Sequence, residues 1–372
     1  MLLSPKVEIA ERRGHVEMTK LSEDEKRQII NKMKKDPLYR EGLPPYTSFD
    51  IHFREHLKET WGRDWGGQSS YAKLRAVVVQ RPGPEAAPKE ALADPQWYSL
   101  PTGLPNLGKM EQEWDNFVRV LNDNGVETIS LNAQQPVLGT YGLPLRCITY
   151  CHETLMVKGG AIIQRCAAGF KRGEEYYHSK RLGELGVPIL YTVHGKGFFE
   201  SSNAVWLDKR SIALATSQRT NMDGINQITP ILQNHGVDDI FIVHLPGPLY
   251  SRGAQVGHGG GSFHLDMVFG VAGPKLAVLY PEHVGYDFVN YLVNTKGFDV
   301  IECPLEEANG VATNFLVLEP GKLVMPAGNP VVTGQLRKRG IKVIEVDLSE
   351  YAKAGGGPTC MTIPLIRDEE KD

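Results

Sequence analysis

The segment FLVLEPGKLVMPAGNPVVTGQLRKRGIKVIEVDL spans residues 315–348 and predicts the architecture of this chain. Its first two β-rich runs, FLVLE and KLVMP, are joined by a Pro-Gly turn, as in a hairpin. A helical pattern follows at residues 330–339, and KVIEVDL then has the pattern of a third strand. The segment therefore predicts one strand–strand–helix–strand unit.

The same unit recurs upstream, from residue 71 onward, at a spacing of roughly 50 residues. The four earlier units carry their helical patterns at residues 109–124, 174–184, 224–234 and 284–295. A repeat at fixed spacing indicates units that pack on their neighbours. Five ββαβ-like units predict an α/β fold closed into a five-bladed propeller, and they argue against an open doubly wound sheet. In such a ring, residues from distant units converge on one central cleft.

The first 70 residues differ from the repeats. They are rich in charge, and helical patterns are present in LSEDEKRQIINKMKK and HFREHLKETW. Ser22 and Glu25 have the spacing of a capping box, and Pro44 and Pro45 interrupt the segment between the two patterns. We expect residues 1–70 to form a helical N-terminal extension and residues 71–372 to form the α/β-propeller domain.

Composition excludes several classes of protein. Hydrophobic residues make up 41% and charged residues 23% of the chain, which is typical of a globular protein. A net charge of −3 gives no basic surface for nucleic acid. No apolar run reaches the roughly 18 residues of a membrane span, and the N-terminus lacks the pattern of a signal peptide. We expect neither a nucleic-acid partner nor a membrane partner, and homo-oligomerisation stays open.

Cysteine usage indicates the cellular compartment. The five cysteines are scattered along the chain, at Cys147, Cys151, Cys166, Cys303 and Cys360. An odd and sparse set is a poor disulfide framework and fits a reducing environment. The sequence therefore predicts a soluble cytoplasmic protein.

Cys360 is the first candidate for chemistry. It lies in AGGGPTCMTIPL, where three glycines and a proline form a turn just before an apolar strand. A lone cysteine is most often a small buried hydrophobe. A core strand does not need so flexible an entrance, however. We therefore expect the Cys360 thiol to project into a cleft as a nucleophile.

His264 and Asp266 lie in GHGGGSFHLDMVF, where we expect a strand that places both side chains on one face. The carboxylate could simply orient the imidazole. A metal pair with His258 is another alternative, although no third ligand lies at a suitable spacing. The GHGGGS loop resembles a dinucleotide-binding loop, but it precedes a strand instead of following one.

Two acids occupy positions equivalent to that of His264. Glu153 in TYCHETLMV and Glu200 in GKGFFESSNAVWL each directly precede a predicted hairpin. A single such acid is usually a solvated loop residue, but equivalent polar positions in three repeats indicate one shared site. Arg219 in ATSQRTN follows a strand of the third unit, and alone it would be read as a surface residue.

Together these segments resemble the guanidine-modifying enzymes of the pentein fold, which include arginine deiminases, dimethylarginine dimethylaminohydrolases and amidinotransferases. FHLDMVF is similar to their His-x-Asp motif, and TSQRT is similar to the Ser-x-Arg-Thr of arginine deiminases. Residues 314–361 are similar to the closing unit and form the most specific segment. The resemblance covers roughly residues 67–365 and implies a five-bladed α/β propeller.

The resemblance implies a role for each catalytic candidate. Cys360 would be the nucleophile, His264 the acid/base, and Glu200 the residue that orients His264. The implied activity is that of a cysteine-dependent hydrolase, acting on the guanidinium group of arginine or a substituted arginine through a thiouronium-type intermediate. Its partner would be a small guanidino substrate, and no metal or organic cofactor is needed.

The resemblance also implies which residues bind the substrate. Asp266 and Glu153 would hold the guanidinium group. Arg219 would bind a substrate carboxylate, helped by Arg172 or Lys171 in GFKRGEE.

Two other functions stay open at this point. GGGPTCM and TSQRT look more like the deiminase versions of these segments, which favours a hydrolase over an amidinotransferase that passes the amidino group to an amine. A binding module on the same fold is disfavoured, because it has no reason to bury a thiol, an imidazole and three acids together. Glu153 stands where Asp is usual and Thr359 where deiminases commonly carry Arg, so the exact guanidino substrate stays open.

Overall fold

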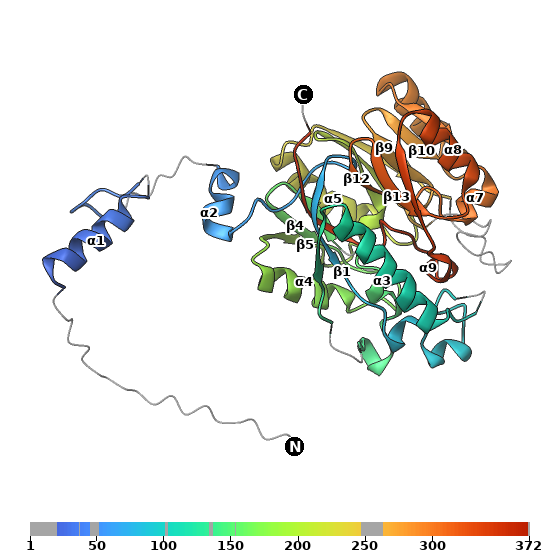
Figure 1. Cartoon of the computed structure of the whole chain (residues 1–372), viewed down its shortest axis with the longest axis horizontal. Coiled ribbons are helices and arrows are strands. Elements are labelled where there is room, and N and C mark those ends of the chain that lie inside the picture. Colours follow the sequence, from blue (N-terminus) through green and yellow to red (C-terminus); the bar gives the residue numbers. More distant parts are fainter. Residues whose placement is uncertain are drawn as a thin grey trace, which may run out of the picture. The chain divides into compact units, whose positions relative to one another are not determined.

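The computed structural model traced in Figure 1 has two compact units, Met1–His52 and Phe53–Asp372. The structure describes residues 21–36, 38–44, 52–100, 103–133, 137–152, 154–246 and 263–370. Within these ranges, no helix combines the length and the apolar character needed to cross a membrane.

The described part of the first unit contains helix α1 (Glu23–Met33). Ser22 and Glu25 form the predicted capping box, in which the Glu25 amide donates to Ser22 Oγ at 3.3 Å and the Ser22 amide donates to Glu25 Oε2 at 2.9 Å. None of the helix's residues is buried. Its start is therefore set locally by the cap.

The second unit contains five three-stranded sheets in the described ranges. Four of them have the predicted order, an antiparallel hairpin whose second strand pairs in parallel with a third strand. Their strands are β3 (Thr154–Val157), β4 (Gly160–Ile163) and β5 (Ile189–Thr192); β6 (Ala204–Asp208), β7 (Ser211–Thr216) and β8 (Asp239–His244); β9 (Phe269–Gly273), β10 (Leu276–Leu279) and β11 (Asp299–Glu302); and β12 (Leu316–Glu319), β13 (Lys322–Pro326) and β14 (Lys342–Val346).

A helix precedes the third strand of each of these sheets. The linking helices are α4 (Glu174–Leu185), α5 (Met222–Asn234), α6 (Tyr286–Asn290, continued by the π-helical turn Tyr291–Thr295) and α8 (Pro330–Lys338). Shorter helices are α2 (Leu57–Trp61), α7 (Leu305–Asn309) and α9 (Ser349–Lys353). The helical patterns seen in the sequence thus correspond to helices, with shifts of at most a few residues at their ends.

The fifth sheet joins the two ends of the second unit. Strand β15 (Ile363–Arg367) pairs antiparallel with β1 (Leu74–Val79), and β1 pairs in parallel with β2 (Glu127–Ser130). Figure 1 shows the red C-terminal strand beside the blue β1. Helix α3 (Leu107–Asp123) lies between β1 and β2 in the chain. The C-terminal strand therefore supplies the first strand of the first unit.

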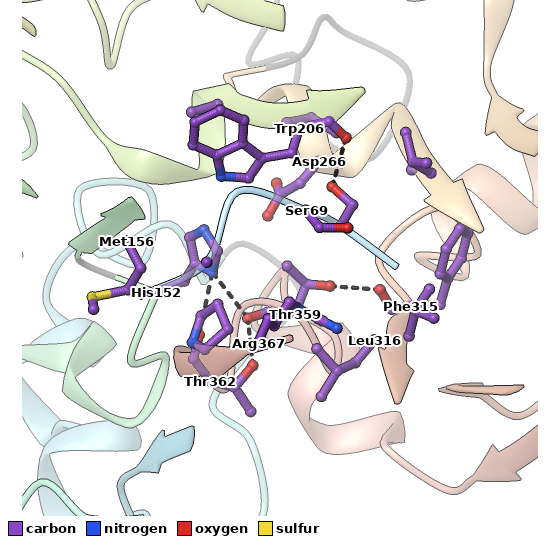
Figure 2. Close-up of a pocket in the computed structure, with 18 of the residues that line it drawn as sticks. Ser69, His152, Met156, Trp206, Asp266, Phe315, Leu316, Thr359, Thr362 and Arg367 are labelled. Atoms are coloured by element: carbon purple, nitrogen blue, oxygen red, sulfur yellow. Dashed lines mark hydrogen bonds between the residues drawn. The ribbon is translucent and has the colours of Figure 1, made fainter. Parts of the chain in front are cut away.

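Neighbouring sheets pack on one another. Strand β15 contacts β3, β6 contacts β9, and β1 contacts β12. Hydrophobic clusters shared by β3 and β6, and by β9 and β12, connect the remaining neighbours. The first strand of every sheet also lines one cavity of about 90 Å³, which we call the axial cavity. Figure 2 shows the labelled side chains around this cavity.

Residues 53–70 pack within the second unit. Leu57 and Trp65 are buried in a hydrophobic cluster with Ala76 and Leu365. Gly66 forms a bridge with Ile366, and its amide donates to the Leu365 carbonyl at 2.7 Å. The division between the two units therefore precedes residue 53 and not residue 71.

Gly66 provides a test of how closely two sheets approach. Gly66 has φ +93°, and a Cβ there would lie 1.7 Å from the Val157 carbonyl oxygen. Gly62 has φ +81° with no atom within 4 Å of such a Cβ. We expect Gly62→Ala to lower the free energy of unfolding by about 1 kcal/mol, since only backbone strain is added. Gly66→Ala should lower the free energy of unfolding by about 4 kcal/mol or more, because the backbone must also move. Equal losses in denaturant unfolding would contradict this packing.

Candidate active site

A second pocket, of about 40 Å³, collects the polar residues that precede the strands. Its lining includes Cys360, His264, Arg219 and Lys171, and we call it the reaction pocket. His152 lines both the reaction pocket and the axial cavity. Residues from distant parts of the chain are therefore brought to one place.

The glycine run before Cys360 is explained by close packing. A Cβ on Gly356 would lie 2.2 Å from the Tyr150 ring, and one on Gly357 would lie 2.9 Å from Asn314. The Cys360 carbonyl accepts a hydrogen bond from the His152 amide at 3.1 Å. The turn is thus pressed against its neighbours on both sides, which fixes the position of the thiol.

Asn314 holds both the backbone and the sulfur of Cys360. Its Oδ1 accepts the Cys360 amide at 3.2 Å, and its Nδ2 donates to Cys360 Sγ at 3.2 Å. Because the backbone amide can only donate, the first contact fixes which way the side-chain amide points. The N–H group that faces the sulfur favours the thiolate form.

The thiol itself is buried, at 6% exposure. Burial, followed by the nearby Asp266 carboxyl, raises the pKa of Cys360 well above its ordinary value. The hydrogen bond from Asn314 acts in the opposite direction but is the smaller effect. In the ligand-free protein Cys360 is therefore a protonated thiol at neutral pH.

His264 is oriented by Glu200. Its Nε2 lies 2.8 Å from Glu200 Oε2 and donates to that carboxylate, so Nδ1 is left to exchange a proton. Glu200 is buried at 1% exposure, and Lys171 Nζ lies 3.1 Å from the same oxygen. Lys171, Arg219 and His264 together lower the pKa of Glu200 well below its usual range despite its burial. Burial lowers the pKa of His264 to about 4, so the ring is neutral at pH 7.

Asp266 reaches the thiol from a turn and not from a strand. His264 is extended, Leu265–Met267 form a 3₁₀ turn, and the strand begins later, at Phe269. Asp266 Oδ2 lies 3.8 Å from Cys360 Sγ, and Oδ1 has no hydrogen-bond partner. The carboxyl is therefore in contact with the sulfur. Burial raises the pKa of Asp266 to about 7.

Arg219 lies between two aromatic rings. Its guanidinium carbon is 5.3 Å from the centre of the Phe170 ring and 5.1 Å from that of Phe263. Nη1 is buried without a hydrogen-bond partner, and its nearest carboxylate atom, Glu200 Oε1, is 3.8 Å away. Arg146 lies 5.3 Å from Phe170 and also lines the pocket. This part of the pocket is suited to an anionic group.

Three positions considered in the sequence fall elsewhere. Glu153 and His258 lie outside the described residues. Arg172 is exposed, donates to the Ala167 carbonyl at 3.0 Å, and is absent from the lining of the reaction pocket. Lys171, the alternative to Arg172, is buried and does line that pocket.

Sequence reasoning did not assign roles to Asn314, Arg146 or His152. Asn314 is the first residue of the segment that resembles the family's closing unit, and nothing in its local sequence pattern indicates a functional role. His152 directly precedes Glu153, and its Nδ1 lies 3.2 Å from the carbonyls of Thr359 and Thr362. Both carbonyls can only accept, so Nδ1 carries the proton and ties His152 to the turn that carries Cys360.

A family model described as N,N dimethylarginine dimethylhydrolase, eukaryotic, matches residues 174–367, just over half of the chain. The chain belongs to this family. The matched range includes Glu200, Arg219, His264 and Cys360. The predicted membership of the guanidine-modifying enzymes of the pentein fold is thereby confirmed.

Individual relatives agree with this assignment. N(G),N(G)-dimethylarginine dimethylaminohydrolase of Pseudomonas aeruginosa is 24% identical over 266 residues, covering 70% of this chain and 90% of the relative. Arginine deiminase of Latilactobacillus sakei subsp. sakei is 22% identical over 416 residues, covering 82% and 98%. The solved structure of SxtG, an amidinotransferase from Microseira wollei, matches with a TM-score of 0.64 at 17% identity, covering 82% of this chain and 98% of that one. This last likeness shows a shared fold.

The hydrogen bond from Asn314 to the sulfur can be tested through the thiol's reactivity. We expect Asn314→Ala to raise the pKa of Cys360 by about one unit, because a donor to the thiolate is lost. Alkylation by iodoacetamide at a fixed pH below that pKa should then slow about tenfold. Asn234→Ala, at the exposed end of α5, serves as the control. An unchanged pH–rate profile for Asn314→Ala would count against the role of this amide.

The raised pKa of Asp266 predicts a pH-dependent stability. Because the folded-state pKa of about 7 lies above the ordinary value, the folded protein holds this proton more tightly than the unfolded chain does. The stabilisation present at low pH is therefore lost as pH rises through 7. Asp266→Asn should match wild type near pH 3 and exceed it by about 4 kcal/mol in free energy of unfolding at pH 8.

Urea unfolding at several pH values measures this difference, with the exposed Asp123→Asn as control. A constant offset between Asp266→Asn and wild type at all pH values is the contradicting outcome.

Proposed function

We propose that this protein is a cysteine-dependent hydrolase that acts on the guanidinium group of arginine or a substituted arginine. The observation that carries the proposal is the convergence of Cys360, His264 and Arg219 on one pocket, with the Asp266 carboxyl against the sulfur. A nucleophile, an acid/base, an acid for the cation and a site for a carboxylate are the groups that such a substrate requires.

The cationic substrate would activate its own nucleophile. Buried acids and thiols hold their protons because nothing nearby compensates the negative charge that they would carry after losing them. A guanidinium placed against Asp266 and Cys360 would supply that charge and lower both pKa values. The Asp266 oxygen that has no partner is a suitable acceptor for a guanidinium N–H. Glu153 is proposed as the second acceptor, from its place beside His152 in the sequence.

The first half-reaction forms a carbon–sulfur bond. His264 takes the thiol proton of Cys360, and the thiolate attacks the guanidinium carbon. The tetrahedral species collapses by breaking one carbon–nitrogen bond, and His264 gives its proton to the departing ammonia or amine. Glu200 stabilises the imidazolium between these two transfers. Cys360 is left as a thiouronium-type adduct.

The second half-reaction regenerates the enzyme. His264 is neutral again and takes a proton from a water molecule, whose oxygen attacks the same carbon. The carbon–sulfur bond breaks, the added oxygen releases its remaining proton to solvent, and His264 returns its proton to the Cys360 sulfur as the urea-type product leaves. If an amine attacked in place of water, the amidino group would be transferred instead. We rank this amidinotransferase activity second, because the matching family is described as a hydrolase.

Substrate selection is proposed to depend on the opposite end of the pocket. Arg219 would bind the α-carboxylate of the amino acid with Nη1, and Arg146 and Lys171 contribute further positive charge to the same pocket. Lys171 takes the place that Arg172 had in the sequence-based hypothesis.

We also propose that the five sheets of residues 71–372 close into a five-bladed propeller, the catalytic domain, with residues 53–70 packed as part of the same unit and the extension limited to the residues before them. The contacts between successive sheets and the cavity shared by their first strands support this closure. The five cysteines are buried free thiols, which supports a reducing, cytoplasmic location.

The activity can be tested with a panel of substrates. Arginine, its N-methylated forms, and arginine plus glycine are incubated separately, and ammonia, amine and urea-type products are measured. Cys360→Ser and His264→Ala should each reduce turnover by at least about 1,000-fold while circular dichroism stays native, because each removes a group that acts on the reacting atoms. A haloacetamidine should label Cys360. Label on Cys303 or Cys166 in its place, or guanidinoacetate formed only with glycine, would overturn the hydrolase assignment.

A further inference from the structure

The axial cavity lies on the other side of the nucleophile turn from the reaction pocket. Thr359 lines the axial cavity, whereas the next residue, Cys360, lines the reaction pocket. His152 contributes to both. Figure 2 shows His152 and Asp266 together with Thr359, Thr362 and Arg367 around the axial cavity. The reaction proposed above uses only Asp266 from this set.

Arg367 is the unexplained group in the axial cavity. It is 6% exposed, and its guanidinium donates to the carbonyl of Ala72. Of its five N–H donors, the other four have no acceptor among the described residues, and no described acid forms an ion pair with it. Burial lowers the pKa of Arg367 to about 9, which leaves the group charged at neutral pH.

The backbone at Gly67 leaves room for the Arg367 side chain. A Cβ on Gly67 would lie 2.7 Å from the Cβ of Arg367, so the glycine provides the space that Arg367 occupies. A guanidinium charge buried without an anion is costly, since neither water nor a carboxylate compensates it fully. The position would be filled at lower cost by Met or Leu, unless the charge itself is used.

Further hydrogen-bond donors lie in the wall of the same cavity. Ser69 Oγ accepts the amides of Tyr71 at 3.1 Å and Ala72 at 2.9 Å, so its own O–H is left to donate. The same residue, Ala72, therefore connects Ser69 to Arg367. The hydroxyl of Thr154 is buried with no partner. A positive charge with unused donors is the chemistry of an anion site.

We propose that the axial cavity is a binding site for a small monovalent anion, held by the guanidinium of Arg367 and the hydroxyl of Ser69. A volume of about 90 Å³ admits a halide with a few waters. Chloride is the abundant ion of this class. The site lies apart from Arg219 in the reaction pocket, although Asp266 lines the axial cavity, and it stands whether or not the proposed hydrolysis is correct.

Crystals of the full-length wild-type protein soaked in bromide test the site directly, because bromide replaces chloride and scatters anomalously. We expect an anomalous peak in the axial cavity, within about 3.5 Å of the Arg367 guanidinium, as for a charged hydrogen bond lengthened by the larger ion. Peaks confined to the protein surface, or a peak only beside Arg219 in the reaction pocket, would overturn the proposal.

Solution stability provides an independent measurement. The chloride concentration is raised from 1 to 100 mM at constant ionic strength. Chloride replaces gluconate, a six-carbon anion that is too bulky for a halide site. Wild-type protein should gain about 2 °C in melting temperature, since the ion binds only the folded state.

Arg367→Gln should abolish this gain. Arg75→Gln should retain the gain in melting temperature. Arg75 lies on the adjacent strand β1, is exposed, and is paired with Asp368. No gain in wild type, or an equal gain in Arg367→Gln, would refute the site. If Arg367→Gln fails to fold, the bromide peak and the wild-type titration decide the question together.

Discussion

The pairing of β15 with β1 is the interaction on which the rest of the structure depends. It joins residues almost 300 positions apart, as in the Leu74–Arg367 register, and completes the fifth sheet. Cys360 lies three residues before β15, so the same pairing places the Cys360 thiol. The turn that carries Cys360 leads directly into β15, and Asn314 accepts a hydrogen bond from its backbone. The completion of the fifth sheet and the position of the Cys360 thiol therefore depend on the same strand pairing, and neither could be changed alone.

The reaction pocket keeps its charges at a cost to stability. Among the described charged groups, Glu200 and Lys171 compensate each other, and His264 also contacts Glu200. Asp266 and Cys360 hold their protons more tightly than they would in water, and Arg219 lies against two aromatic rings instead of a close carboxylate. A cationic ligand that also carries a carboxylate compensates each of these groups at once. Part of the substrate's binding energy would therefore be spent on creating the thiolate and the carboxylate.

Local pattern predicted the helices and hairpins well, because each ββαβ unit has its own periodicity and turn residues. It predicted the apolar strand after Cys360 but not the partner of that strand, since β15 pairs with β1, almost 300 positions away. Cys360, His264 and Glu200 were predicted from glycine-rich context and equivalent positions in the repeats. The role of Asn314 could not be predicted, because an asparagine inside an apolar run carries no chemical signature until its partner is known. Lys171 and Arg172 are adjacent and equally basic, and only the turn before α4 decides which one points inward.

The two cavities together suggest why the nucleophile turn is so firmly held. Thr359 and Cys360 face opposite compartments, and each compartment carries a buried arginine, Arg367 in one and Arg219 in the other. His152 spans the layer between them through its bonds to Thr359 and Thr362. If this layer shifted, the thiol would move relative to His264, and a displacement of about 1 Å is enough to slow such a reaction severely. An anion beside Arg367 would reduce the repulsion between that buried charge and an incoming guanidinium, so occupancy of the axial cavity would favour substrate binding on the far side of the turn.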